Sequence, residues 1–473
     1  MAHMSQSSDG PAYDPHGGWD EAFQDDGTPR ALYSEVFAAL AERDLESLRR
    51  SVGGELEDAG VHFGEGERPG TFPLDPIPRL ISGAEWSLLE GGLAQRARAL
   101  GSFLADAYGD RAIVTAGRVP ARVIESADHF EPWMMGVPVT LAGCVTGLDL
   151  VRGSDGVLRV LEDNIRTPSG IAYMASVRTA LDGHLPCHDG ATRLDPAPAF
   201  DLLGGALRAA APDGRGDPSL ALLSDGPGNS AWWEHTEIAR RLGVPIVSPD
   251  DLFVRGGRLH ARLGDAGARE LQVVYRRTDE DRLRDASGSA TWLAGALLGP
   301  CRSGTLTVVN PLGAGLADDK LVHAYVDEMV RFYLGEEPLL PSVRTYDLGD
   351  PVVLESATPR LGELVVKPRT GHGGAGVVVG PHASEQDRRT LAERVAERPT
   401  AWVAQETVMI STHPTVCNGA LQPRHVDLRP FVIGCGEGAA AVPGALTRVA
   451  FNKGALVVNS SQNGGGKDTW ILV

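Results

Sequence analysis

Apolar residues recur at helical spacing near the start of the chain, in residues 31–50. Their spacing predicts one amphipathic helix over this segment. The positions concerned are Leu32, Val36, Phe37, Leu40, Leu45 and Leu48. A second helix is predicted over residues 85–108. The preceding residues 1–30 are polar and rich in Gly, Pro and Asp, and we expect a loose or wrapping arm there.

From residue 147 the pattern changes from helical spacing to alternation. GLDLVRGSDGVLRVLEDN, residues 147–164, reads as a strand, a turn at residues 154–156 and a second strand. Residues 219–310 predict an α/β module with strands at 220–225, 244–249 and 271–279 and a helix at 232–243. A strand, a helix and a strand at this spacing form a βαβ unit in a partly parallel sheet.

The last part, residues 311–473, predicts alternating helices and strands. A helix is expected over 318–334, and strands are expected at 363–368, 376–380, 400–406, 429–433, 448–452 and 455–460. The pattern as a whole indicates an α/β (α+β) protein in four parts. These are the arm 1–30, residues 31–218, the module 219–310 and residues 311–473.

Composition and charge exclude several classes of protein. The net charge is −18 and no block of Lys and Arg is present, so we expect no nucleic-acid partner and no anionic membrane partner. No apolar run reaches the roughly 18–20 residues that span a bilayer, and the start lacks the features of a secretion signal. The five cysteines are scattered without CxxC spacing, which predicts neither disulfides nor a cysteine zinc site and favours the cytoplasm.

A glycine-rich loop, GHGGAG at residues 371–376, lies between two β-like segments. It lacks the GK[ST] of a P-loop and the following helix of a dinucleotide-binding fold, so we expect it at the tip of a hairpin. Glycines at such a tip let backbone N–H groups approach phosphate oxygens, and Lys367 precedes the loop. The alternative is a flexible hairpin that binds no ligand.

Oxygen-bearing side chains gather on the predicted hairpin of residues 147–164. Glu162 and Asn164 are two apart on one strand and point to one face, and Asp149 on the partner strand can join them. Two carboxylates and an amide suit Mg²⁺, while Arg152 and Arg166 can counter phosphate charge or an oxyanion. The alternative is a salt-bridged surface hairpin.

In combination, five segments resemble the circularly permuted type 2 branch of the ATP-grasp superfamily, a relative of glutathionylspermidine synthetase-like ligases. The segments are TGLDLVRGSDGVLRVLEDNIRTPSG, LVVKPRTGHGGAGVVV, VAQE, HVDLRPFVI and VVNSSQNGGGKDTW. The likeness runs from about residue 75 to the end of the chain and implies a circularly permuted ATP-grasp fold with an inserted α/β module. In an ordinary ATP-grasp enzyme the lysine and glycine loop precede the metal-binding strand, and permutation reverses that order.

The resemblance also implies a role for each matching position. It implies Mg²⁺ ligands at Asp149, Glu162 and Asn164; phosphate-binding lysines at Lys320 and Lys367; a phosphate flap at Gly373, Gly374 and Gly376; and an adenine and ribose hinge at Gln405 and Glu406. Arg429 resembles an arginine that binds phosphate or acylphosphate, and Arg448 and Lys467 are further candidates for contact with substrate or phosphate. Arg166, at the start of RTPSG, completes the set of expected catalytic arginines.

Several of these positions also have simpler interpretations. Lys320 could be a solvated residue of an amphipathic helix, Glu406 could cap a turn, and Lys467 could pair with Asp468 on the surface. His235 and His372 are expected to be structural or close to substrate rather than metal ligands.

The resemblance implies an ATP- and Mg²⁺-dependent ligase that joins a small-molecule or peptide carboxylate to an amine through an acylphosphate. The alternatives are an ATP-dependent phosphotransferase and a non-catalytic nucleotide-binding protein. Residues 225–230 and Arg276–Arg277 stand at predicted strand ends of the 219–310 module, where open α/β sheets bind ligands, so we expect them to help bind the acid or the amine.

Overall fold

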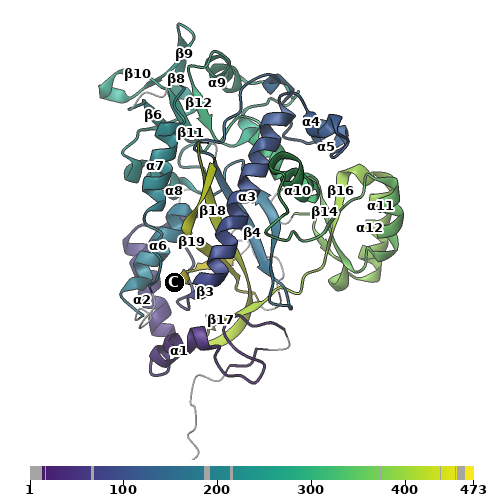
Figure 1. Ribbon diagram of the computed structural model, residues 1–473. Coiled ribbons are helices and arrows are strands. Elements are labelled where there is room, and N and C mark those ends of the chain that lie inside the picture. Colours follow the sequence, from purple (N-terminus) through teal and green to yellow (C-terminus); the bar gives the residue numbers. More distant parts are fainter. Residues whose placement is uncertain are drawn as a thin grey trace, which may run out of the picture.

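The computed structural model of the protein describes residues 13–15, 18–64, 69–185, 192–212, 217–371, 375–436, 438–452, 454 and 464–473. Within these residues the largest sheet has six strands and forms the centre of the molecule (Figure 1). Its order is β20-β19-β18-β4-β5, with β17 paired to β18. The strands are β4 Val145–Arg152, β5 Leu158–Asn164, β17 Thr412–Cys417, β18 Ala420–Cys435, β19 Gly438–Ala450 and β20 Gly464–Lys467.

The β4–β5 hairpin confirms the strand–turn–strand prediction for residues 147–164. The strands are antiparallel, with Asp149 opposite Glu162 and Gly147 opposite Asn164. The predicted strand 429–433 is part of the much longer β18, and the predicted strand 448–452 overlaps the end of the longer β19, which stops at Ala450. The predicted strand 455–460 lies outside the described residues.

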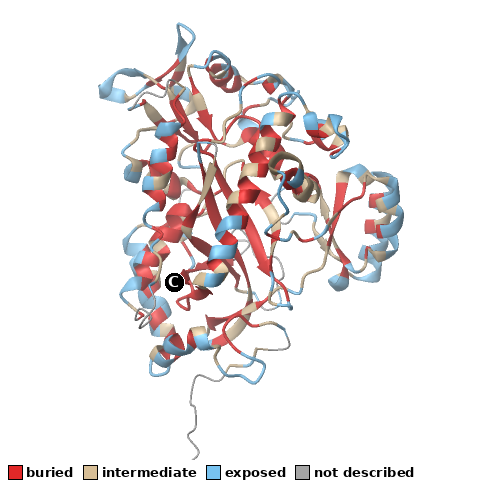
Figure 2. Cartoon of the chain, viewed as in Figure 1, coloured by how far each residue is buried: buried red, intermediate tan, exposed pale blue. Residues whose placement is uncertain are grey.

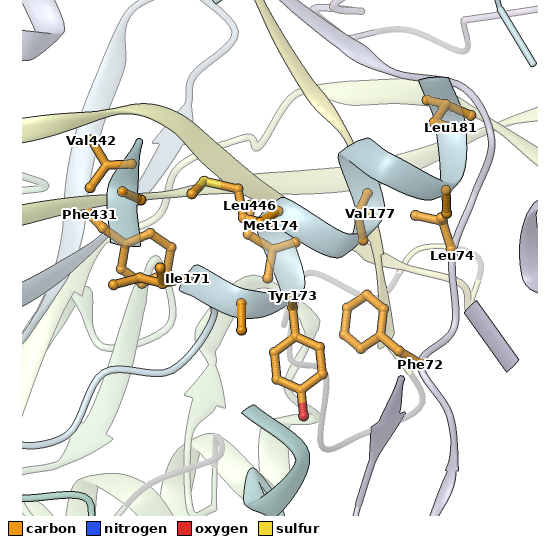
Figure 3. Close-up of a cluster of buried hydrophobic side chains, with 14 of the residues drawn as sticks. Phe72, Leu74, Ile171, Tyr173, Met174, Val177, Leu181, Phe431, Val442 and Leu446 are labelled. Atoms are coloured by element: carbon orange, nitrogen blue, oxygen red, sulfur yellow. The ribbon is translucent and has the colours of Figure 1, made fainter. Parts of the chain in front are cut away.

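Both faces of the central sheet are covered by helices. Helix α3 (Gly83–Ala107), predicted from the sequence, packs on β18 and β19 through one apolar cluster that includes Leu428 and Val432. Helices α6 (Ile171–Asp182) and α7 (Ala199–Ala209) contact the same strands through a second cluster, which includes Phe431 and Leu446 (Figure 3). Side chains alternate between the two faces along a strand. Leu428 and Val432 of β18 therefore point toward α3, whereas Phe431 points to the opposite face.

The inserted module contains the predicted parallel sheet. Its order is β12-β11-β6-β7, and all neighbours are parallel. The elements are β6 Leu220–Leu223, α8 Trp232–Leu242, β7 Ile246–Val247, β11 Val273–Arg276, α9 Trp292–Arg302 and β12 Thr307–Val309. The sequence prediction omitted an antiparallel sheet of β8 Leu252–Arg255, β9 Arg258–Arg262 and β10 Ala268–Glu270. Gly256 and Gly257, both with positive φ, turn the β8–β9 hairpin.

A smaller lobe lies to one side of the central sheet in Figure 1. Its sheet has the order β13-β16-β14-β15, with β13 Thr345–Asp347, β14 Leu364–Pro368, β15 Val378–Val379 and β16 Trp402–Glu406. Helices α11 (Pro351–Ala357) and α12 (Glu385–Glu397) belong to this lobe, which has its own apolar core beneath exposed helix surfaces (Figure 2). Pairing of Val365 with Val379 confirms that strands flank the glycine loop as a hairpin.

Two helix predictions were wrong. The predicted helix 31–50 is interrupted after α1 (Ser34–Leu40), because Asp44 caps a new helix, α2 (Leu45–Asp58), by accepting a hydrogen bond from Ser47 N at 2.6 Å. The predicted helix 318–334 is only a short α10 (Val326–Met329) between a 3₁₀ segment and a π turn. Asp319 accepts from Leu321 N there, a local bond that competes with helix formation.

The N-terminal arm wraps against the fold where the structure describes it. Asp20 bridges to Thr412, and the buried carboxylate of Glu21 accepts from Arg79, Arg152 and Ser411. Burial alone would raise the pKa of Glu21, but Arg79 and Arg152 lower it to about 2. Arg152 therefore serves this internal network rather than a phosphate.

The remaining elements are short. They are β1 His62–Phe63, β2 Gly70–Thr71, β3 Arg79–Ser82, α4 Ala112–Thr115, α5 Ala121–Glu125 and β21 Thr469–Leu472. Among the helices that the structure describes, none has the length and apolar character needed to cross a bilayer.

Candidate active site

A cavity of about 530 Å³ is lined by residues of both the central sheet and the smaller lobe. The central sheet contributes Asp149, Glu162, Asn164, Asp427, Arg429 and Arg448, and the lobe contributes Lys367, Gln405 and Glu406. Arg166 and Lys320, which lie outside the strands, complete the set of sequence-predicted residues at the wall. Segments far apart in the sequence therefore meet at one site.

One part of the wall is apolar and includes the buried side chain of Gln405. Val151, Leu161, Val365 and Val379 line this part of the cavity together with Gln405. The Gln405 amide nitrogen donates to the carbonyl of Leu161 at 3.3 Å, and a carbonyl can only accept, so the geometry fixes the orientation of the amide. Its Oε1 is buried and has no hydrogen-bond partner among the described residues, and an exocyclic amine could donate to it.

Glu406 follows Gln405 and remains an ionised acceptor. Its carboxylate accepts from Tyr346 Oη at 2.5 Å and from Arg360 at 3.0 Å. Desolvation opposes ionisation, but Tyr346 and Arg360 together lower the pKa of Glu406. The Glu406 carboxylate thus lies at the cavity wall, where hydrogen bonds from Tyr346 and Arg360 fix its position.

Two ammonium groups lie near the carboxylate of Glu162. Lys320 Nζ is 3.9 Å from Glu162 Oε1 and donates to the carbonyl of Gly371 at 2.6 Å. The side chain of Lys367 is half-buried, and in the described part of the chain its ammonium has neither a hydrogen-bond nor an ion-pair partner. Burial lowers the pKa of Lys367, although Glu162 acts in the opposite direction. An unpaired cation in a cavity wall marks a place for an anion.

Asp149 is held by two arginines. Arg429 donates to both of its oxygens at 2.6 and 2.8 Å, and Arg448 lies 2.9 Å away and also binds Asp427. Burial alone would raise the pKa of Asp149, but these guanidinium groups lower it to about 2. Asp427, which the sequence prediction omitted, has a raised pKa because it is buried. Arg429 and Arg448 are thereby held at the cavity wall.

The predicted Mg²⁺ ligands fit a metal ion unequally. Both carboxylate oxygens of Asp149 already accept hydrogen bonds from guanidinium groups. Glu162 is partly exposed. Asn164 has a buried amide nitrogen without a partner among the described residues. In the part of the chain that the structure describes, no three His, Cys, Asp or Glu residues form a metal-binding group by themselves. Glu162 and Asn164 still fit Mg²⁺, which takes few protein ligands and completes its shell with waters or phosphate oxygens.

At another part of the wall, Arg166 lies between a histidine and an aspartate. Its Nη1 is 3.0 Å from His129 Nε2 and 3.2 Å from Asp279 Oδ1. Asp318 accepts from the backbone amides of Ile165 and Arg166, and burial raises the pKa of Asp318 to about 7. No sequence motif marked His129 or Asp318, because the residues that surround them come from separate segments.

Several predicted residues lie elsewhere. Lys467 does not line the cavity, since its fully buried ammonium forms an ion pair with Asp75. Arg276 is also fully buried, where it binds carbonyl groups and Glu280, and the buried Arg277 binds Pro168 O and Ser169. These two arginines join the inserted module to other parts of the fold and are not free for substrate, contrary to expectation.

Other residues of the prediction are only partly placed. Gly373, Gly374 and His372 lie outside the described residues, and Gly376, with φ +72°, leads into β15. His235 is buried with Nδ1 2.8 Å from Ser224 Oγ, in agreement with a structural role.

A lysine-bearing hairpin lobe faces a sheet that carries carboxylate and amide side chains, as the resemblance to ATP-grasp proteins implies. The chain belongs to the circularly permuted ATP-grasp type 2 family, whose profile matches residues 78–450. Permutation accounts for the order of the motifs, with Glu162 before Lys367.

Several known proteins are similar to this chain. A Frankia alni protein provisionally named glutamate–cysteine ligase 2-3 is 43% identical over 471 residues, which is 96% of this chain but 54% of that protein. A Synechocystis protein, named only as uncharacterized, is 40% identical over 98% of both chains. The glutathione synthetase-like effector of Globodera pallida, solved in its apo form, shares the fold with a TM-score of 0.59 at 11% identity, over 91% of this chain and 98% of that one. The chain therefore spans about half the length of its Frankia relative.

Proposed function

We propose that the protein is an ATP- and Mg²⁺-dependent carboxylate–amine ligase that forms an amide or peptide bond through an acylphosphate. Membership of the ATP-grasp family and the ligase-like name of a relative support an ATP-dependent ligase. The observation that carries the proposal is the ammonium of Lys367, which has no partner among the described residues and faces the same cavity as Glu162. The site residues, the metal and the intermediate are our proposals.

In the proposed complex, ATP occupies the cavity with its adenine on the apolar wall at Gln405. Its phosphates meet Lys320 and Lys367, and Glu162 and Asn164 would hold Mg²⁺. The ion would supply positive charge that offsets the charge of the phosphates. Glu406 is then available as an acceptor for a ribose hydroxyl.

The proposed reaction begins with a carboxylate attacking the γ-phosphorus of ATP, so that ADP leaves. Both reactants are anionic, and the lysines together with Arg166, Arg429 and Arg448 offset their repulsion. The amine next attacks the acyl carbon, phosphate leaves, and the attacking nitrogen loses a proton. The name of the Frankia relative points to amino-acid substrates, and we propose small-molecule or peptide acids and amines as the class. The scattered cysteines favour the reducing cytoplasm as the compartment.

A product assay tests this proposal against its rivals. The protein is incubated with Mg·ATP and pooled amino acids or short peptides, with and without hydroxylamine, and ADP and hydroxamate are measured. Acid-dependent ADP with a hydroxamate supports the ligase. A stable phosphorylated product that needs no amine would instead identify a phosphotransferase, and ATP binding without any ADP would identify a non-catalytic binder.

Gln405 is expected to select the nucleobase. Its Oε1 can accept from the exocyclic amine of adenine but meets the carbonyl oxygen of guanine with repulsion. Gln405→Leu should reduce the preference for ATP over GTP by about 10-fold, since one such hydrogen bond is worth roughly 1–3 kcal/mol when its loss leaves a buried group unpaired. Competition binding of the two nucleotides measures this ratio, and an unchanged ratio would contradict the assignment.

A further inference from the structure

We propose that His129 is a positioning residue whose neutral imidazole holds the Arg166 guanidinium toward the reacting acyl group. The inference rests on the proposed function, because it assigns Arg166 to the oxyanion that forms when the amine attacks. No proton passes through His129 in this scheme. The histidine acts on the reaction only by fixing the arginine.

The contact between the two side chains determines which imidazole nitrogen carries the proton. His129 Nε2 lies 3.0 Å from Arg166 Nη1. A guanidinium group only donates, so Nε2 must accept with its lone pair and the proton must sit on Nδ1. Nδ1 has no hydrogen-bond partner within the described residues and lies 3.9 Å from Glu280 Oε2. A protonated imidazole would lose the bond to Arg166, because both nitrogens would then be donors.

Glu280 lies on the other side of the imidazole, within ion-pair distance of Nδ1 but beyond hydrogen-bond distance. Its carboxylate is fully buried and accepts from Arg276 Nη2 at 3.1 Å and from Gly315 N at 3.0 Å. A Cβ at position 315 would lie 2.2 Å from Glu280 Oε2 and 2.8 Å from His129 Cβ, so only glycine permits this approach. The His129 imidazole therefore lies between the buried Glu280 carboxylate and the Arg166 guanidinium at the cavity wall.

The charges around His129 oppose one another. Desolvation is the largest influence and lowers the pKa of His129, and Arg166 and Arg284 also lower it, whereas Glu280 and Asp281 raise it. Asp279 and the half-buried Asp318 face Arg166. The net result is a pKa below the usual histidine range, so the imidazole is neutral at neutral pH. Positioning of Arg166 is complete above this pKa and is lost as the pH falls through it.

Two substitutions separate this role from others. His129→Gln places an amide oxygen where Nε2 stood, which can accept from Arg166 and does not titrate. It should keep kcat within about threefold of wild type at neutral pH and remove the decline of kcat on the acid side. His129→Leu provides no acceptor and should reduce kcat by about 10–100-fold with KM for ATP little changed, as expected when a catalytic group is misplaced.

The comparison has outcomes that would overturn the proposal. Equal loss of kcat in the glutamine and leucine variants would indicate a proton-transfer role, and unchanged pH profiles in both would indicate no role. A failure of every acid to release ADP would count against the proposed ligase alone. Nitrogen-15 NMR of labelled histidine, with the His129 signal assigned from His129→Gln, gives an independent readout without turnover. The expected result is an Nδ1–H tautomer with a pKa below 6.5. An Nε2–H tautomer would refute the arrangement.

Discussion

Replacing Glu162 with glutamine is expected to reduce ATP turnover by about 10²–10³-fold, the size of loss seen when one electrostatic group of a preorganised site is removed. Glutamine keeps the shape of the side chain but removes the charge that faces Lys320 at 3.9 Å and is felt by Lys367. It also removes a carboxylate ligand from the proposed metal site. The side chain is 35% exposed, so the fold should remain intact.

A matched control comes from the smaller lobe. Glu385 has a side chain that is 90% exposed and forms a surface ion pair with Arg389, so Glu385→Gln should leave turnover unchanged. ADP release under saturating Mg·ATP compares the two variants, and circular dichroism checks their folding. Wild-type turnover in Glu162→Gln would remove this residue from the site.

Lys467→Met is expected to destabilise the protein by about 3–5 kcal/mol, because removing one partner of a buried ion pair leaves the other charge uncompensated. Both Lys467 and Asp75 are fully buried, and the ammonium also donates to the carbonyl of Pro414 at 3.0 Å. Within the described residues, the Asp75 carboxylate would then keep its bonds from the backbone amides of Ile77 and Val416 but have no cation beside it. Affinity for ATP should not change in the protein that remains folded.

Urea unfolding measures this loss, and nucleotide binding at low urea measures the affinity. Arg389→Met is the control, because that side chain is 62% exposed on α12 and its loss should change stability by less than about 0.5 kcal/mol. A stable Lys467→Met protein with strongly weakened ATP binding would return Lys467 to the nucleotide site, where the sequence resemblance had assigned it.

The two hairpins that carry site residues could be predicted from the sequence. Hairpins such as β4–β5 depend on alternation and on a local turn, so the meeting of Asp149 with Glu162 followed from residues close in the chain. The lysine hairpin of β14 and β15 followed in the same way. Their convergence on one cavity required the family resemblance, because no local pattern links the two hairpins.

The failures have a common physical cause, which is burial. Lys467 and Arg276 carry the positive charge that a ligand-binding residue needs. Tertiary packing nevertheless buries both side chains and pairs them with Asp75 and Glu280. Conversely, His129 belongs to no sequence motif. It was not predicted because its hydrogen bond is to Arg166, which lies in another segment of the chain. Charge type can be read from sequence, whereas the partner of a charge depends on long-range contacts.

The most direct test of the central claim follows the oxygen of the substrate acid. Once an acid that supports ADP release is found, it is supplied with its carboxylate labelled with oxygen-18, and the phosphate product is analysed by mass spectrometry. Activation through an acylphosphate predicts one labelled oxygen in each phosphate released, because the carboxylate oxygen that attacks phosphorus leaves with it. Unlabelled phosphate formed together with the amide product would contradict the acylphosphate mechanism.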